Sequence, residues 1–263
     1  METQPALRYY KRREIFPFVI LFPHSHSPRS TSMKLISPLV VTTALIALTH
    51  AASGAVVTQW TFNSSNAALT LTPYIGAGTA TYVGGTAANG TGIATGWADD
   101  TTAIAPVVNN RWTMKTFPTA SNASGTAGAQ FAVSTVGYED VIVTFGLRNS
   151  NTSSKYAMLQ YSTDGTNFTN FGDVITGTGD VWTSVSRDLS ALTAVENIST
   201  FAFRVVSVFA PGTSAYAAAR STSTYAATGT YGFDLVTVSG TAIPAPGAVS
   251  LLAVAALMAR RRR

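Results

Sequence analysis

The sequence has no cysteine, and its three histidines, His24, His26 and His50, all lie close to the N-terminus. Without cysteine the protein can form neither a disulfide nor a thiolate metal site. The chain after residue 55 has no histidine, which excludes Ser-His-Asp and Cys-His catalysis, histidine zinc sites and the most common general base from it. Catalysis in this part of the chain would have to depend on carboxylates.

Charged residues are also scarce. They make up 11% of the chain, and the formal net charge of +5 comes from its two ends. Between Val56 and Thr241 there are seven basic and ten acidic residues, which gives this central segment a net charge of −3. Its basic residues do not gather with aromatic residues into a patch, so we expect no nucleic-acid binding.

Long hydrophobic runs are absent from the central segment, and the run near the C-terminus is short. It extends from Ala248 to Met258, follows Pro244 and Pro246, and precedes four arginines at 260–263. A stable membrane helix needs about 20 apolar residues, and the prolines oppose a longer helix. The arginines would hold their end of the run on the cytoplasmic side of a membrane.

This tail resembles the PEP-CTERM sorting signal of Gram-negative bacteria over residues 243–263, although it has Pro244-Ala245-Pro246 in place of Pro-Glu-Pro. The resemblance implies that an exosortase processes a sorting tail at 242–263 while the protein is transiently anchored in the inner membrane. It further implies that the body then reaches the cell surface or extracellular matrix. The sorting motif would consist of Pro244, Ala245, Pro246, Gly247, Arg260, Arg261, Arg262 and Arg263.

A second targeting signal is predicted near the N-terminus. Met33 and Lys34 precede a mostly apolar stretch at 35–48, which small residues follow. This order is typical of a signal peptide, here 33–55, with cleavage after Ala51 or Ala55. Residues 1–32 are interpreted as a disordered extension from a misassigned start codon. We therefore expect an exported ectodomain at 56–241 between an N-terminal signal helix and a C-terminal hydrophobic sorting helix.

The ectodomain is predicted to be all-β. Apolar and polar residues alternate over 140–148 and 201–209, which indicates half-buried strands, and Asp164-Gly165 is typical of a hairpin turn. Further strands are predicted at 56–62, 111–117, 129–134, 155–163, 166–171, 182–189 and 232–238. Many strands at short spacing favour an antiparallel sandwich. A single helical turn is expected within 189–196, and short strands joined by loops within 77–110.

Several segments of this ectodomain, such as Leu159–Phe168 and Gly232–Gly240, resemble the jelly-roll ectodomains that often precede sorting tails of this kind. Those domains are similar to carbohydrate-binding and adhesion sandwiches. The resemblance therefore implies a jelly-roll-like β-sandwich whose partner is an extracellular polysaccharide or another surface molecule.

Aromatic residues beside polar loops are candidates for stacking on sugars. Tyr216 and Tyr225 lie in a long polar loop at 211–230, and Tyr231 follows it. Rings of this kind pack against the apolar faces of sugars while their polar atoms form hydrogen bonds. Trp97 also flanks a polar loop, whereas Trp60, Trp112 and Trp182 are expected in the core.

Asp234, in the last predicted strand, is the candidate ligand of a structural calcium ion, since calcium prefers several oxygen ligands. The competing interpretation is a solvated aspartate or one paired with Arg204, and no acidic loop motif accompanies Asp234. No other cofactor is expected.

Three functions remain open. The leading hypothesis is a non-catalytic, exported surface or matrix protein. The second is a carbohydrate-binding module. The third is a glycoside hydrolase that uses carboxylates only, for which Asp99-Asp100 and Glu139-Asp140 are adjacent pairs. Neighbouring residues on a strand point to opposite faces, so neither pair forms a catalytic dyad by itself.

Overall fold

Short stretches with alternating apolar and polar residues form the strands of this protein. The computed structural model describes residues 54–63, 71–88, 96–98, 100–101 and 108–244. Its elements are β1 (Ala55–Trp60), β2 (Gly78–Val83), β3 (Ala87–Ala88), β4 (Trp112–Lys115), β5 (Gly128–Val133), β6 (Tyr138–Asn149), β7 (Tyr156–Ser162), β8 (Thr169–Thr176), β9 (Trp182–Asp188), the 3-10 turn η1 (Thr193–Val195), β10 (Ala202–Val208) and β11 (Tyr231–Ala242).

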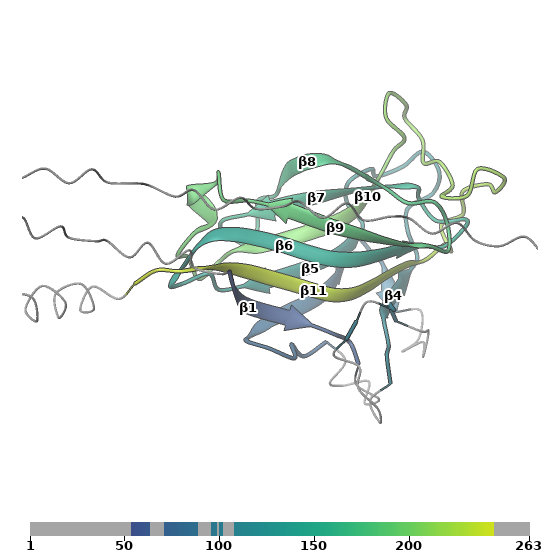
Figure 1. The fold of residues 1–263 in the computed structure, drawn as a ribbon. Coiled ribbons are helices and arrows are strands. Elements are labelled where there is room, and N and C mark those ends of the chain that lie inside the picture. Colours follow the sequence, from purple (N-terminus) through teal and green to yellow (C-terminus); the bar gives the residue numbers. More distant parts are fainter. Residues whose placement is uncertain (1–53, 64–70, 89–95, 99, 102–107, 245–263) are drawn as a thin grey trace, which may run out of the picture. The chain divides into compact units, whose positions relative to one another are not determined.

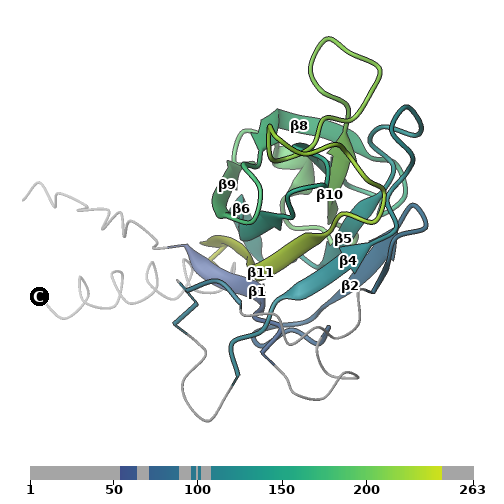
Figure 2. The ribbon, with the colours of Figure 1, turned by 90° about the vertical axis from the view of Figure 1, so that its right-hand side faces the viewer.

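The strands form two sheets that pack face to face. Sheet A has the order β3-β4-β11-β6-β9, and β1 also pairs with β11; sheet B has the order β2-β5-β10-β7-β8. All of these pairings are antiparallel. Figure 1 shows the strands from the side, and Figure 2, turned by 90°, shows the sheets as two layers. The predicted all-β antiparallel sandwich is confirmed.

The core lies between the sheets and is rich in aromatic residues. Phe131 of β5 packs against Trp60, Trp112, Phe203 and Phe233, with ring centroids 4.9–6.2 Å apart within this group. Burying one such side chain contributes about 1.5–3 kcal/mol to stability. Because inward residues alternate with outward ones along each strand, filling this core also determines which side chains line the two outer faces.

The expected helical turn is confirmed by η1, and the strands expected within 77–110 include β2 and β3. The predicted extension, the signal peptide and the sorting tail from Ala245 onward lie outside the described residues. Within the described part of the chain, no helix is long and apolar enough to cross a membrane.

Candidate functional site

The outer face of sheet A carries the candidate site. In β6, Phe145 and Leu147 point into the core. Because successive residues of a strand point to opposite faces, Gly146 and Arg148 point outward. Gly146 pairs with Asp234 on β11 and with Ser184 on β9. These outward positions lie next to one another across three strands.

Two tryptophans lie together over Gly146. A Cβ atom at residue 146 would lie 2.6 Å from the ring of Trp97 and 3.3 Å from the ring of Trp182. The two rings have centroids 6.3 Å apart and planes inclined by 25°. Both side chains are half-buried. A glycine is required at residue 146, because a larger residue would displace Trp97.

Hydrogen bonds hold the segment that carries Trp97 against the sheet. The Trp97 amide donates to Asp234 Oδ2 at 2.6 Å, and the Asn109 side-chain amide donates to the Trp97 carbonyl at 2.8 Å. The Gly96 amide also donates to the Asn109 carbonyl at 3.0 Å. The position of Trp97 therefore depends on Asp234, a residue of the central strand of sheet A.

Asp234 is the most perturbed carboxyl of the site. It is 0% exposed. Burial raises the pKa of Asp234 to about 7, although the hydrogen bonds from the Trp97 and Leu235 amides act to lower it. Asp100 adds a smaller raising effect on this pKa and Arg111 a lowering one. Burial is thus the largest influence on the pKa of this carboxyl.

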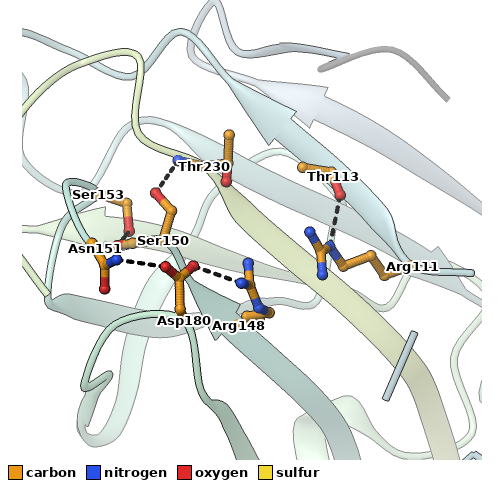
Figure 3. Close-up of polar contacts among 8 residues, drawn as sticks. All are labelled: Arg111, Thr113, Arg148, Ser150, Asn151, Ser153, Asp180 and Thr230. Atoms are coloured by element: carbon orange, nitrogen blue, oxygen red, sulfur yellow. Dashed lines mark hydrogen bonds and ion pairs between the residues drawn. The ribbon is translucent and has the colours of Figure 1, made fainter. Parts of the chain in front are cut away.

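Two arginines flank the tryptophan pair. Arg148 forms an ion pair with Asp180, with Nη2 and Oδ1 2.6 Å apart, and Asn151 donates to the other oxygen of Asp180 at 2.5 Å. Figure 3 shows the Arg148 guanidinium group directed toward Asp180, and the Arg111 guanidinium group extending from its backbone toward the side on which Arg148 lies. Burial, followed by the charge of Arg148, lowers the pKa of Arg111.

Arg111 reaches Arg148 by crossing β11 at a glycine. A Cβ atom at residue 232 would lie 2.7 Å from Arg111 Cδ, so the arginine stem rests directly on the Gly232 backbone. Arg111 Nε also donates to Thr113 Oγ1 at 3.1 Å. The outer face of sheet A therefore brings a tryptophan pair and two guanidinium groups together over two glycines.

The surroundings of Asp234 are rich in oxygen atoms, as the predicted calcium site requires. Asp100 is 5% exposed, and Oδ1 of Asn109 is buried without a hydrogen-bond donor in the described part of the chain. A Cβ atom at residue 96 would collide with Asn109 Oδ1 and lie 2.5 Å from Asp234 Oδ2, which places these oxygens together. Such oxygens are the donors that calcium prefers.

The fit to calcium is incomplete, however. No group of three or more histidine, cysteine, aspartate or glutamate side chains that could hold a metal occurs among the described residues. Both oxygens of Asp234 also accept backbone hydrogen bonds. Calcium at Asp234 stays a prediction.

The three tyrosines expected to contact a ligand are placed differently from the expectation. Tyr231 is 0% exposed and donates its hydroxyl to the carbonyls of Ser154 and Tyr156, because β11 begins inside the sandwich. Tyr216 is 6% exposed and stacks on Tyr225, with centroids 4.8 Å apart. The exposure expected of Tyr216 in the loop at 211–230 is therefore wrong, and Tyr231 offers no ring face to solvent either. Ligand binding by these tyrosines stays a prediction.

Tyr225 is half-buried, and its hydroxyl donates to the Pro118 carbonyl at 2.6 Å. Parts of the long loop project from the end of the sandwich, as the yellow-green segments in Figure 1 show, whereas Tyr216 donates its hydroxyl to the Ala123 carbonyl at 3.1 Å. Its aromatic residues thus tie the loop to the domain.

Sequence reasoning missed most of the observed site. Trp182 was expected in the core together with Trp60 and Trp112; those two are buried, whereas Trp182 is half-buried on the outer face. Arg111 and Arg148 were not selected. The alternation over 140–148 places Arg148 on the face opposite the core, and this was the one sequence feature that indicated its outward position.

No protein-family model and no curated protein matches the sequence. Among solved structures, the chain is similar to the CBM22-1 xylan-binding domain of Xyn10C from Paenibacillus barcinonensis, with 13% identity, a TM-score of 0.40, and coverage of 74% of this chain and 99% of that one.

It is also similar to the K2 cleaved adhesin domain of Lys-gingipain, a Porphyromonas gingivalis protein, with 14% identity, a TM-score of 0.37 and coverage of 68% and 96%. A cyclase from Fischerella sp. TAU matches with 11% identity, a TM-score of 0.30 and coverage of 66% and 82%. These are distant resemblances among β-sandwich domains, and they carry no argument about ligand or activity.

Proposed function

We propose that this protein is a non-catalytic, exported surface or matrix protein whose sandwich binds a polysaccharide on the outer face of sheet A. The observation that carries the proposal is the Trp97–Trp182 pair over Gly146. The outer surface of a folded domain seldom holds two adjacent tryptophans without a binding role, since such residues dominate interiors and interfaces.

The groups around the tryptophans suit a sugar chain. The rings supply apolar surface for the C–H faces of pyranoses, and the Arg148–Asp180 pair beside them supplies a donor and an acceptor for hydroxyl groups. Because Trp182 is paired with Arg148 across β9 and β6, the apolar and polar groups have a fixed spacing. Such a prearranged surface loses little conformational entropy when a ligand binds.

The arrangement of carboxyl groups favours binding over hydrolysis. A glycosidase needs two carboxyl groups that reach the glycosidic bond from either side. Asp234 is 0% exposed and Asp100, whose charge helps to raise the pKa of Asp234, is 5% exposed, so both carboxyl groups are shielded from a sugar chain. We therefore assign the Asp234 carboxyl the role of holding the Trp97 segment rather than that of transferring a proton.

Substitution of the two tryptophans tests the binding proposal. In affinity electrophoresis against a panel of bacterial and plant polysaccharides, we expect Trp97→Ala and Trp182→Ala each to weaken binding roughly two- to tenfold, as an aromatic contact is worth about 0.5–1.5 kcal/mol. Tyr74→Ala is the matched control, because Tyr74 is 66% exposed and lies in the loop before β2. Equal retardation of all three variants and the wild type would reject this face as the binding site.

Export and sorting form the second part of the proposal and rest on the sequence. The signal-like segment at 33–55 and the tail at 242–263 support passage through the inner membrane and processing by an exosortase. Mass spectrometry of the mature protein from its native host provides the test. We expect a mature N-terminus after Ala51 or Ala55 and a C-terminus that lacks Arg260–Arg263, whereas an intact tail on the mature protein would contradict the sorting step.

A further inference from the structure

The outer face of sheet B carries a row of polar side chains in register across all five strands. Pairing between neighbouring strands aligns Thr81, Gln130, Arg204, Gln160 and Asn170. The residues on either side of them along the strands, such as Phe131 and Phe203, point into the core. The row therefore faces outward, on the opposite side of the sandwich from the tryptophan pair.

Arg204 lies at the centre of this row with a fixed orientation. Its Nε donates to Gln130 Oε1 at 2.7 Å, and its Cζ lies 3.5 Å from the centroid of the Phe168 ring. One edge and one face of the guanidinium group are thus occupied. Because the group is planar and has five N–H donors, the two terminal nitrogens keep donors on the remaining edges.

The charge of Arg204 has no protein counterpart in the described part of the chain. The ion pair found there joins Arg148 to Asp180 on sheet A. The contacts of Arg204 are a neutral amide and an aromatic ring. Partial burial also lowers the pKa of Arg204, and no carboxylate among the described residues acts against that effect. Burying part of a cation without a carboxylate beside it costs free energy, because the charge loses water without gaining a partner. An anionic ligand would offset this cost by forming charge-assisted hydrogen bonds with Arg204.

The residues beside Arg204 suit a sugar chain rather than a lone anion. Gln130 and Gln160 flank it on the two neighbouring strands. Gln160 Nε2 donates to Gly125 and Asn170, so its side-chain oxygen is the group that can accept from a hydroxyl, while the Gln130 side-chain nitrogen can donate to one. Strands lie about 4.8 Å apart, so the row extends for roughly 19 Å across the sheet, the length of several sugar units.

We propose that the outer face of sheet B is a second binding surface, separate from the tryptophan pair, for an acidic polysaccharide. Arg204 binds the carboxylate of a uronic acid unit through its two terminal nitrogens, Phe168 holds the guanidinium plane in place, and Gln130 and Gln160 bind hydroxyl groups of the adjoining units. This inference does not depend on the function proposed for sheet A.

The test measures binding of the full-length protein to polygalacturonate and to its methyl-esterified form, which keeps the sugars and removes the charges. We expect binding to polygalacturonate, little binding to the ester, and weaker binding at high salt. Arg204→Gln should weaken binding about tenfold or more, and Arg204→Lys should weaken it less, since lysine keeps the charge but loses the planar pair of donors. Arg220→Gln, which removes an exposed charge elsewhere, is the matched control.

Two further variants keep the outcomes distinct. Gln160→Ala perturbs the same row without touching Arg204, so it tests the surface if Arg204→Gln fails to fold. Polygalacturonate binding that is lost in Trp182→Ala but kept in Arg204→Gln would place this ligand on sheet A and overturn the proposal. The proposal is overturned if polygalacturonate does not bind, if the ester binds equally well, or if Arg204→Gln behaves like Arg220→Gln.

Discussion

Asp234 shows how one buried carboxyl links the core of sheet A to the surface above it. Its pKa, raised by burial to about 7, exceeds that of an aspartate in an unfolded chain. The folded protein therefore holds this proton more tightly than the unfolded chain does. The resulting stabilisation is fully present below about pH 4 and is lost as the pH rises toward 7.

We expect the contribution of Asp234 to the free energy of unfolding, measured by urea denaturation in metal-free buffer, to fall between pH 4 and pH 7. One pKa unit corresponds to about 1.4 kcal/mol, so the upper bound on the decrease is about 4 kcal/mol. Asp234→Asn removes the titrating group and should flatten this part of the pH profile. Parallel profiles for the wild type and Asp234→Asn would show that Asp234 does not titrate in this range.

Tyr231 shows how a residue predicted to bind a ligand can instead hold the fold. Its buried hydroxyl donates to two backbone carbonyls, 3.2 Å away at Ser154 and 3.0 Å away at Tyr156. Tyr231→Phe leaves both carbonyls with less hydrogen bonding, so we expect it to reduce the free energy of unfolding by about 1–2 kcal/mol. Tyr74→Phe, at an exposed tyrosine, should have no measurable effect. A loss of polysaccharide binding without a loss of stability in Tyr231→Phe would reverse this assignment.

At the scale of the strand, Gly146 in the middle of β6 provides the floor under the tryptophan pair. A valine at residue 146 would bring its Cβ within 2.6 Å of the Trp97 ring, so Gly146→Val should move Trp97 off the sheet. We expect a red shift of tryptophan emission and weaker polysaccharide binding. Thr144→Val is the matched control, because Thr144 lies two residues away on the same outer face. Equal emission and binding in the two variants would mean that Gly146 is not needed to seat Trp97.

The strands were predictable where alternation was strict. The stretches 140–148 and 201–209 alternate along their length, and they form most of β6 and β10. The stretch 77–110 was harder, because its glycine, threonine and alanine residues contribute little apolar surface to either face. Within that stretch, β2 is held by pairing with β5 rather than by a pattern of its own.

The candidate site was less predictable than the strands, because pairing between distant segments assembles it. Trp97 and Trp182 both lie over Gly146 of β6, and Arg111 crosses β11 over Gly232. Alternation indicates which way a residue points, but it does not give the strand order. The same limitation explains why Arg204 could not be related in advance to Gln130 and Gln160.

At the scale of the whole molecule, the sandwich offers two outer faces with different chemistry, and calcium would act on the first of them. If calcium binds at Asp234, millimolar calcium should raise the midpoint of thermal unfolding by several degrees relative to EDTA. This follows because a hundredfold excess over Kd stabilises by about 2.7 kcal/mol, and each kcal/mol is worth about 2–4 °C in a domain of this size. Asp234→Asn should abolish the shift. Equal midpoints of the wild type in calcium and in EDTA would show that calcium does not bind at Asp234.

The proposed function depends on polysaccharide binding through the Trp97–Trp182 pair. The most direct measurement is a titration of the full-length protein with soluble polysaccharides, followed through tryptophan emission, because Trp60 and Trp112 are buried while Trp97 and Trp182 are half-buried. We expect a saturable blue shift with at least one polysaccharide class and its loss in the Trp97→Ala, Trp182→Ala double variant. An emission spectrum that no polysaccharide alters would contradict the proposed function.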